Sequence, residues 1–248
     1  MRAAGIDIGS RFIKLALVEE GRLVLSRKSE TSFSPLDRCN ELLKDVKTDN
    51  IMATGYGRHL FEVHIGSRTI TEIKAFARGA RALFPSCRTI IDIGGQDTKV
   101  ISLDEKGNVR KFEMNDRCAA GTGKFLEIMA RTLDYQIKDF GSVTSKTGRN
   151  IRINSICTVF AESEVVSLVA KGEDRADIGV ALHRLVANRV LSMLKRIPIE
   201  DDIVFAGGCA SNRRLREFIE RELGKAVYVA DTPEITGALG AALYATEN

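Results

Sequence analysis

The sequence predicts an α/β protein built from two related halves. Short hydrophobic strands alternate with amphipathic helices along the chain. The tetrapeptide Ile-Asp-Ile-Gly occurs at residues 6–9 and again at residues 91–94, and in each case a lysine stands seven residues after the aspartate. A period near 85 residues is too long for a solenoid repeat and favours two related subdomains. The length of 248 residues, with 44% hydrophobic residues, is enough for two cores of moderate size.

The first series of elements begins with a strand meander around a Gly-Ser turn. A helix, a short strand and a second helix follow, and Thr71 is expected to cap the second helix. Pro85 then interrupts the pattern. In chain order the expected elements are Ala3–Ile8, Phe12–Val18, Arg22–Ser26, Leu36–Val46, Ile51–Thr54 and Glu72–Leu83.

The second series repeats the strand meander and continues with longer helices. Apolar residues recur at helical spacing in these later segments, and a Gly-Gly turn follows the fourth strand. No flexible linker or low-complexity segment is expected between the elements. In chain order the elements are Thr89–Ile93, Thr98–Leu103, Val109–Met114, Ala120–Leu133, Val159–Lys171, Asp174–Lys195, Ile203–Phe205, Asn212–Leu223, Val227–Ala230 and Pro233–Ala245.

Charge and hydropathy exclude several classes of protein. The chain has 37 basic and 33 acidic residues, a net charge of +4, without the runs of like charge that typically bind polyanions, so no nucleic acid is expected. No stretch approaches the roughly 18 to 20 apolar residues of a membrane span, and the first residues do not resemble a signal peptide. We therefore expect a cytoplasmic protein without a membrane partner. Five cysteines, an odd number, do not suggest a secreted disulfide framework.

Three turns combine glycine with a polar neighbour directly after a hydrophobic strand. Such turns direct backbone N–H groups outward, where a phosphate can approach without meeting a Cβ. Asp7 and Asp92 stand where a carboxylate can hold Mg²⁺ directly or through water, and Lys14 adds a cation. A single turn of this kind more often only joins two strands, but three turns with a repeated aspartate favour phosphate binding. The turns are Gly9-Ser10, Gly94-Gly95-Gln96-Asp97 and Gly207-Gly208.

Two common nucleotide motifs are absent from the chain. The sequence contains no G-x-x-x-x-G-K-[ST] stretch and no G-x-G-x-x-G that opens a helix after a strand. The paired hairpins and the late Gly207-Gly208 turn instead resemble the phosphate-1, phosphate-2 and adenosine motifs of the actin, hexokinase and heat-shock ATPase superfamily. The resemblance implies two actin-like (ribonuclease H-like) subdomains with nucleotide in the cleft between them. Residues 1–86 and 232–248 would form the first subdomain. Residues 87–231, which include Cys118 and Cys157, the cysteines of the cluster discussed below, would form the second.

A narrower resemblance covers nearly the whole chain. The chain is similar to the ATP-dependent activators of 2-hydroxyacyl-CoA dehydratases, also called component A proteins, and to their benzoyl-CoA reductase relatives. The segments that carry the similarity are Ala53-Thr54-Gly55-Tyr56-Gly57-Arg58, residues 91–97, Met114-Asn115-Asp116, Cys118-Ala119-Ala120-Gly121-Thr122-Gly123, residues 157–164 (Cys-Thr-Val-Phe-Ala-Glu-Ser-Glu) and Gly237-Ala238-Leu239-Gly240-Ala241-Ala242.

Cys118 and Cys157 are the candidate metal ligands. They stand 39 residues apart, and spacing alone favours two buried thiols over a ligand pair. Each precedes a predicted helix start, however, where thiolates are stabilised. Two thiolates supply half the ligands of a cubane cluster, and a two-fold dimer axis supplies the other half. The resemblance implies the same arrangement, one [4Fe-4S] cluster bridging a homodimer. Cys39, Cys87 and Cys209 are expected to be structural.

The resemblance also implies the reaction and the partners. The protein would accept an electron from ferredoxin or flavodoxin and use MgATP hydrolysis to deliver it to an iron–sulfur dehydratase, a reductase or a double-cubane cluster protein. Residues expected at the phosphates, at Mg²⁺ or at the attacking water are Asp7, Asp92, Gln96, Gly9, Ser10, Lys14, Gly94 and Gly95. Residues expected near the nucleoside of ATP or ADP are Gly207, Gly208, Asn212 and Glu234.

One residue departs from the resembled pattern, and two other classes of function compete. Arg11 replaces the usual threonine of the first phosphate turn; it would reach the γ-phosphate, a partner or, the interpretation we favour, solvent.

A small-molecule kinase without a cluster would explain the glycines but neither cysteine motif. A heat-shock-like regulatory ATPase would need a separate substrate-binding domain, for which the chain leaves no residues.

Overall fold

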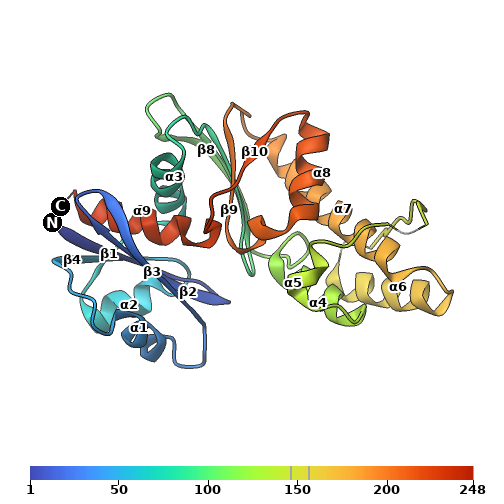
Figure 1. Cartoon of the computed structure of the whole chain (residues 1–248), viewed down its shortest axis with the longest axis horizontal. Helices are drawn as coiled ribbons and strands as arrows, with labels where there is room; N and C mark the ends of the chain where they lie inside the picture. Colours follow the sequence, from blue (N-terminus) through green and yellow to red (C-terminus); the bar gives the residue numbers. More distant parts are fainter. Residues whose placement is uncertain (146, 156, 248) are drawn as a thin grey trace.

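The computed structural model describes residues 1–145, 147–155 and 157–247 and shows an elongated molecule with two β-sheets side by side (Figure 1). Helices cover the outer faces of both sheets, and two further helices lie between them. The two ends of the described chain lie together at the first-sheet end of the molecule. No helix of the described part is both long and apolar enough to cross a membrane.

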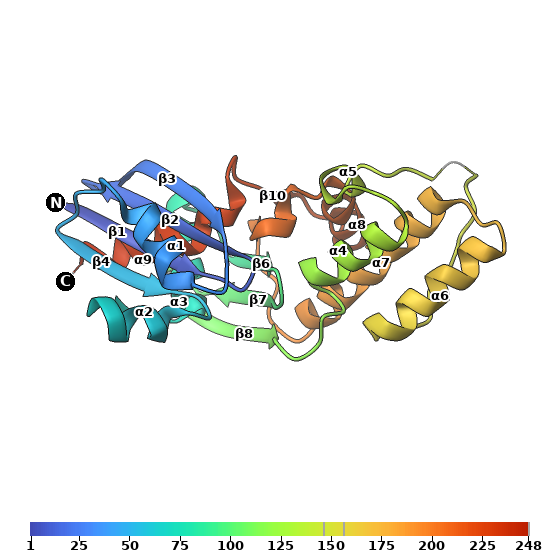
Figure 2. The same cartoon turned by 90° about the horizontal axis from the view of Figure 1, so that it is seen from below.

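The first sheet has five strands in the order β3-β2-β1-β4-β5. The first three strands form an antiparallel meander, and the last two run parallel to β1. Helices α1 (Pro35–Leu43) and α2 (Arg58–Ile65) cover one face of the sheet (Figure 2), where Cys39 and Phe61 enter its core. The strands are β1 (Arg2–Ile8), β2 (Phe12–Glu19), β3 (Arg22–Glu30), β4 (Asn50–Thr54) and β5 (Arg68–Thr69).

The second sheet repeats this topology. Its order is β10-β9-β6-β7-β8, so that β6, β7 and β8 form the meander and β9 and β10 run parallel to β6. The correspondence is strand for strand, because β6 occupies the position of β1 and β9 that of β4. The strands are β6 (Thr89–Ile93), β7 (Thr98–Leu103), β8 (Val109–Asn115), β9 (Ile203–Ala206) and β10 (Val227–Tyr228).

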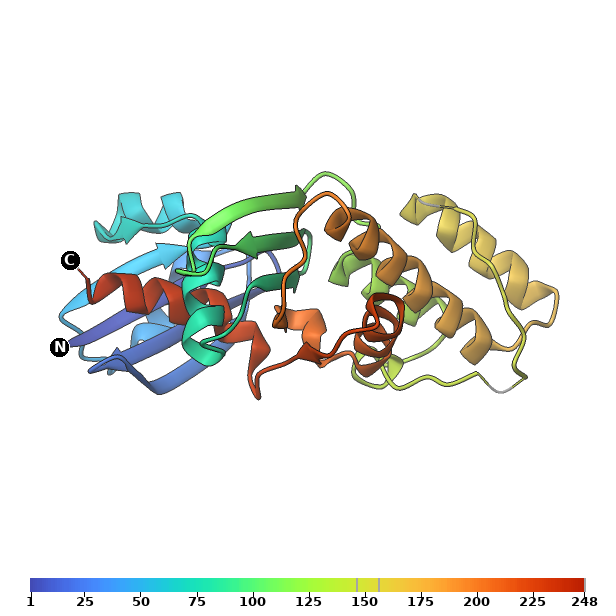
Figure 3. The ribbon, with the colours of Figure 1, turned by 90° about the horizontal axis from the view of Figure 1, so that it is seen from above.

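Helices α3 (Glu72–Leu83) and α9 (Thr236–Ala245) pack against each other between the sheets (Figure 3). Phe76, Ala77 and Ala80 of α3 enter the core of the second sheet. Helix α9 packs on β1, β2 and β4 of the first sheet and is apolar on nearly all sides. Each central helix therefore covers one sheet and joins it to the other.

A helical layer covers the far face of the second sheet. The largest core cluster of the molecule lies there, between strands β6, β7 and β9 and the surrounding helices. The 20-residue helix α7 is buried along much of its length, and Asp174 caps its first turn through bonds from Ala176 and Asp177. The helices of this layer are α4 (Gly123–Thr132), α5 (Ile137–Phe140), α6 (Thr158–Ala170), α7 (Arg175–Leu194) and α8 (Arg213–Leu223).

Most predicted elements are confirmed, with several corrections. Helix α4 begins at Gly123 rather than at Ala120, because Gly121 adopts a φ of +94° that ends the preceding loop in a left-handed turn. The predicted helix from Pro233 is a 3₁₀ turn, η2 (Pro233–Ile235), followed by α9. The strand expected over Val227–Ala230 has two residues. Elements α2, β5 and α5 carry too few periodic residues to be predicted.

Candidate nucleotide site

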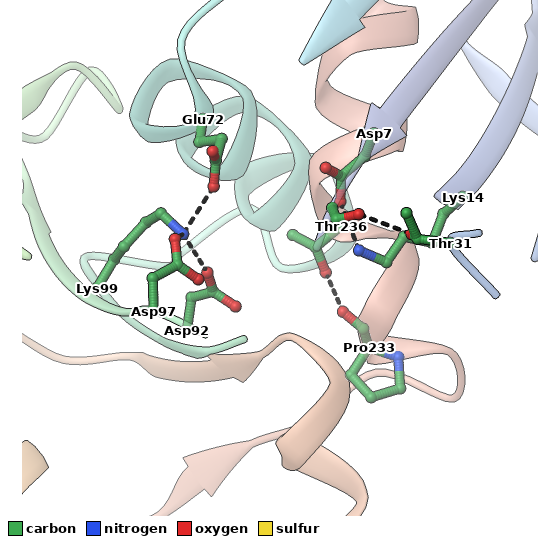
Figure 4. A network of polar contacts seen from close by, with 10 residues as sticks. Asp7, Lys14, Thr31, Glu72, Asp92, Asp97, Lys99, Pro233 and Thr236 are labelled. Carbon is green, nitrogen blue, oxygen red and sulfur yellow. Dashed lines mark hydrogen bonds and ion pairs between the residues drawn. The ribbon is translucent and has the colours of Figure 1, made fainter. Parts of the chain in front are cut away.

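Each sheet places an aspartate and a lysine directly opposite one another on neighbouring strands. Asp7 on β1 faces Lys14 on β2, and Asp92 on β6 faces Lys99 on β7. The lysine Nζ atoms lie 2.9 Å from Asp7 Oδ2 and 3.1 Å from Asp92 Oδ2. The sequence repeat is thus a structural repeat, and Figure 4 shows the two ion pairs on either side of the same space.

A glycine from the neighbouring parallel strand lies against each aspartate. A side chain at Gly55, just after β4, would come within 2.5 Å of Asp7 Oδ1, and one at Gly207, just after β9, within 2.1 Å of Asp92 Oδ1. Both glycines have positive φ angles, +89° and +82°. Only glycine both adopts a positive φ without strain and leaves room for the aspartate oxygen. This explains why glycine-rich segments follow both β4 and β9.

The Lys99 ammonium joins three carboxylates. Besides Asp92, its Nζ lies 2.5 Å from Asp97 Oδ2 and 2.7 Å from Glu72 Oε2 at the start of α3 (Figure 4). Burial alone would lower the pKa of Lys99, but the three carboxylates, Asp92 foremost, hold it well above its ordinary value. The lysine is therefore charged at neutral pH and ties the start of α3 to the second sheet.

Asp92 keeps one carboxylate oxygen without a partner in the described chain. Burial, with a contribution from Asp97, raises the pKa of Asp92 against the opposing effect of Lys99. Asp92 Oδ1 is buried and has no hydrogen-bond partner among the described residues. Four carboxylates, those of Asp7, Glu72, Asp92 and Asp97, lie with two lysines in this cluster. Carboxylate oxygens are the ligands that Mg²⁺ takes, so Asp92 would be the residue to hold that ion, but no three acidic side chains of the described chain are placed around one.

The first two glycine turns, one from each sheet, contact each other. A side chain at Gly95 would lie 2.9 Å from Arg11 Cβ and 3.4 Å from Ser10 Oγ, so the turns touch. Each turn is closed by its own backbone, through Gly9 N–H to Phe12 O and Gly94 N–H to Asp97 O. Gln96 stands exposed at the tip of the second turn. The sequence-predicted phosphate residues of the two halves are therefore brought together.

The second turn is also bound to helix α4. The N–H groups of Gly123 and Lys124 donate to Gly94 O at 2.9 Å and Gly95 O at 2.8 Å. Gly123 has no room for a side chain, because a Cβ would lie 3.0 Å from Gly94 O and 3.1 Å from Cys209 Sγ. The phosphate-2 turn and the start of α4 consequently form one rigid unit.

The Arg11 side chain is 41% exposed, as the expected contact with solvent requires, and it also pairs with two carboxylates. Its Nε donates to Glu127 Oε1 of α4 at 2.8 Å, and a second guanidinium nitrogen lies 3.2 Å from Glu30 on β3. The guanidinium also lies over the Phe12 ring. The hydrogen bond that Arg11 donates to Glu127 is the main cause that raises the pKa of Arg11. Acceptors on opposite sides of the cleft fix this side chain.

The third glycine turn connects the two halves near Asp92. Gly207 N–H donates to Pro233 O at 3.1 Å, and Gly208 is exposed with no heavy atom within 4 Å of a Cβ placed there. Glu234, on η2, accepts from Lys28 at 2.5 Å. Although partial burial opposes it, the Lys28 ammonium lowers the pKa of Glu234.

The Asn212 side chain caps helix α8 and contacts His183. Its Oδ1 accepts from Leu215 N–H at 3.0 Å and so caps α8, and its Nδ2 lies 3.0 Å from His183 Nε2. The side chain is therefore committed to the protein itself, and its predicted contact with a nucleoside stays a prediction. Gly208 is the freely accessible residue of the turn.

The five cysteines fall into two groups. Burial raises the pKa of Cys39, Cys87 and Cys209 to about 12, which keeps these thiols protonated. Cys157 is exposed and is the N-cap residue of α6, as predicted. Cys118 is half-buried in the loop between β8 and α4, five residues before the helix begins rather than at its start.

The loops around these two cysteines are held by neighbouring side chains. Asn115 Nδ2 donates to Cys118 O at 2.8 Å. The Glu164 carboxylate accepts from the N–H groups of Asn154 and Ser155, at 3.0 and 2.9 Å, just before Cys157. Partial burial tends to raise the pKa of Glu164, but the hydrogen bonds from Asn154 and Ser155 outweigh it and lower the pKa. Among described residues, no group of three or more His, Cys, Asp or Glu side chains is placed to hold a metal ion within one chain.

Sequence reasoning misses two residues of the site. Glu72 is expected only as part of a helix, since no local pattern shows that α3 starts beside Lys99. Glu127 lies inside a predicted helix, and its partner Arg11 stands 116 residues away. The motif around Cys157 does indicate that Glu162 or Glu164 bonds to the nearby loop, and Glu164 is the one that does.

Two sheets of identical strand order, with an aspartate–lysine pair and a glycine turn in each, define an actin-like ATPase. A protein-family model also matches nearly the whole chain. The chain belongs to the BadF/BadG/BcrA/BcrD ATPase family, whose model matches residues 4–245.

Relatives with stated activities are similar over their whole length. The (R)-2-hydroxyglutaryl-CoA dehydratase activating ATPase of Acidaminococcus fermentans is 39% identical over 250 residues, which are 97% of this chain and 95% of the relative. The activator of lactoyl-CoA dehydratase of Anaerotignum propionicum is 41% identical over 256 residues, 100% and 98% of the two chains. The structure of the activator of the 2-hydroxyisocaproyl-CoA dehydratase from Clostridium difficile, with bound ADPNP, superposes with a TM-score of 0.91 at 39% identity and covers 100% of this chain and 95% of that one.

Proposed function

We propose that this ATPase is an iron–sulfur electron-transfer activator of a dehydratase or reductase. It accepts an electron from ferredoxin or flavodoxin on a [4Fe-4S] cluster shared by a homodimer, and ATP hydrolysis drives delivery of that electron to an iron–sulfur partner. The relatives support activation of 2-hydroxyacyl-CoA dehydratases as the class of function. A kinase without a cluster is less favoured, because it leaves both cysteine motifs unexplained.

The accessibility of the cysteines carries the proposal. Cluster iron binds thiolates, so a ligand must ionise and must reach iron shared with another subunit. Cys157 is exposed and Cys118 is half-buried, and they are the two cysteines in the resembled motifs. One chain offers two such ligands, and a second copy supplies the other two. When bound, the cluster supplies reversible one-electron chemistry.

The surroundings of Cys157 support a dimer. Val159 and Phe160 in the first turn of α6 are each 67% exposed, an unusual position for apolar side chains beside a polar loop. A second copy placed against this turn would cover both side chains and bring the second pair of cysteines close. Cys157 is the N-cap residue of α6, where the positive end of the helix dipole favours a negatively charged cluster.

The nucleotide half of the function rests on the residues between the sheets. Backbone N–H groups of Ser10 and Gln96 at the turn tips are available for phosphate oxygens, and Lys14 adds positive charge. Asp92, with its unpartnered Oδ1, is the residue we expect to hold Mg²⁺ or to orient the attacking water. In hydrolysis the water oxygen bonds to the γ-phosphorus, the bond to the ADP oxygen breaks, and a nearby carboxylate accepts the proton. Phosphoryl transfer needs mainly such positioning and charge neutralisation.

The first experiment is anaerobic purification followed by iron, acid-labile sulfide and absorption measurements. We expect about four irons and four sulfides per dimer, with an absorption that dithionite bleaches. Iron-free protein that is anaerobic and still binds ATP would contradict the electron-transfer proposal and favour the kinase.

Substitution of the cysteines tests the ligand assignment. Cys118→Ala and Cys157→Ala should each remove the cluster and leave ATP binding within about twofold of the unsubstituted chain, since neither residue touches the glycine turns. Cys87→Ala, a change at a buried thiol in the second core, is the matched control and should keep the full iron content. A Cys118 or Cys157 variant with full iron content would remove that residue from the ligand set.

A further inference from the structure

Arg11 forms an ion pair that crosses the nucleotide cleft. It lies in the turn between β1 and β2 of the first half, and its Nε is 2.8 Å from Glu127 Oε1 on α4 of the second half. The side chains are 41% and 21% exposed, so the pair lies partly in solvent rather than in either core. The second acceptor, Glu30 at 3.2 Å, belongs to the same half as Arg11.

Glu127 lies on the helix that the phosphate-2 turn already holds. Gly94 O and Gly95 O accept the first two N–H groups of α4, and Glu127 follows one turn later. Cys118 lies just upstream of the same helix start, in a loop fixed through Asn115. Arg11 therefore attaches the phosphate-1 turn to a unit that contains the phosphate-2 turn and leads to a candidate cluster ligand.

We propose that the Arg11–Glu127 pair is a clasp that holds the cleft closed around bound nucleotide and makes opening of the cleft a movement of α4. This inference rests on the proposed function of the cleft as a nucleotide site. Arg11 is a positioning residue in this account, because it acts through Glu127 and the two turns. The turns approach closely at Gly95 and Arg11, so the two halves cannot separate there unless the clasp opens.

Nucleotide exchange kinetics test the clasp. With a fluorescent ADP analogue, Glu127→Gln should raise both the association and the dissociation rate by about two- to fivefold, the range expected for a partly exposed ion pair. Added salt should accelerate release from the unsubstituted chain but much less from the variant, because the charged pair is already broken. A general loss of structure would not accelerate association.

Two matched variants isolate the contact across the cleft. Glu30→Gln removes the other carboxylate bound to Arg11 but leaves both halves joined, and Lys124→Gln removes the other cation near Glu127, 3.5 Å away. Both should exchange nucleotide at the unsubstituted rate. The double variant Arg11→Gln/Glu127→Gln should be no faster than Glu127→Gln alone, since the same contact is lost.

A second measurement follows α4 directly. Hydrogen exchange over residues 123–132 should slow when ADP saturates the unsubstituted chain, and this protection should fall in Glu127→Gln but not in Glu30→Gln. Unchanged exchange rates in Glu127→Gln, or a change in association alone, would overturn the clasp while the nucleotide site stands. A chain that binds no labelled ADP would overturn the proposed function and the clasp with it.

Discussion

His183 is a buried, neutral histidine that connects two parts of the second half. Its side chain is fully buried on α7, its Nδ1 lies 2.7 Å from Gly179 O, and its Nε2 faces the Asn212 amide. The Asn212 amide donates to Nε2, so the ring proton is on Nδ1, where it donates to Gly179 O. The ring also packs on Phe140, with centroids 4.5 Å apart. Burial lowers the pKa of His183 to about 4.

This histidine makes stability depend on pH. Between pH 6.5 and about 4 the unfolded chain binds a proton at His183 that the folded chain does not. The free energy of unfolding therefore decreases as pH falls, by about 1.4 kcal/mol per unit from this group. His183→Gln should flatten the dependence across that window, measured by denaturant unfolding. His59→Gln, at an exposed histidine, should leave the slope unchanged; an equal slope in both variants would contradict the assignment.

At the scale of single residues, the sequence predicts groups whose partners are close along the chain. Asp7 and Lys14 could be anticipated because a hairpin places them opposite one another. Arg11 could not, because its acceptor Glu127 comes from the other half and only the tertiary fold brings them together. The same holds for Glu72, which reaches Lys99 through the packing of a whole helix.

The contact between α3 and α9 depends on glycines. A side chain at Gly240 would lie 1.8 Å from Ala75 O, and one at Gly79 would lie 2.0 Å from Thr236 O. On the other side of α9, a side chain at Gly5 would lie 2.0 Å from Ala238 O. The helices and β1 therefore approach at backbone distance, and the Gly-Ala-Leu-Gly-Ala-Ala motif is a packing surface.

Gly240→Ala should destabilise the protein. Alanine favours helix by up to about 1 kcal/mol, but the clash with a backbone oxygen forces the helices apart at a cost of about 1–3 kcal/mol or more. We expect a net loss in thermal or denaturant unfolding of the nucleotide-free protein. Gly208→Ala, where no heavy atom lies within 4 Å of the added Cβ, is the control and should change stability by less than about 1 kcal/mol. Equal stabilities would mean that the helices can separate without cost.

Periodicity predicts the long elements and most of the short strands, but it misses α2, β5 and α5. Helices α3, α7 and α8 carry enough apolar residues on one face, or a clear cap, to be found within one or two residues. Helix α4 was placed three residues early because Ala119 and Ala120 favour helix, while the positive φ of Gly121 is set by the fold. The two-residue strands β5 and β10 are defined by their neighbours alone.

On the scale of the whole molecule, the repeated motif predicts the duplicated architecture. One tetrapeptide, found twice, implies two sheets of the same kind, and the strand order agrees in both. The division into residues 1–86 with 232–248 and residues 87–231 stays a prediction. Helix α3 shows why such a boundary is hard to draw, because it precedes residue 87 yet enters the core of the second sheet.

A chain that ends at Ile235 should fail to fold its first half. Without α9, the apolar faces of β1 and β2 at Ala3, Ala16 and Val18 lose their cover. We expect rapid proteolysis within residues 1–70 and loss of cooperative unfolding. A chain that ends at Ala245 loses the exposed ion pair of Glu247 with Arg78 and the hydrogen bonds of Thr246 to Leu243, but keeps α9; it is the control and should resist proteolysis. Survival of the first half without α9 would show that this cover is dispensable.

The position of α9 also sets an order of events during synthesis. The strands of the first sheet leave the ribosome early, but the helix that covers their inner face is made only after the entire second half. The second sheet has all its strands and outer helices by residue 228 and can fold as soon as that segment emerges. The half that is translated first is therefore completed last, and until then its strands expose the apolar face that α9 later covers, the kind of surface that makes folding intermediates prone to aggregation.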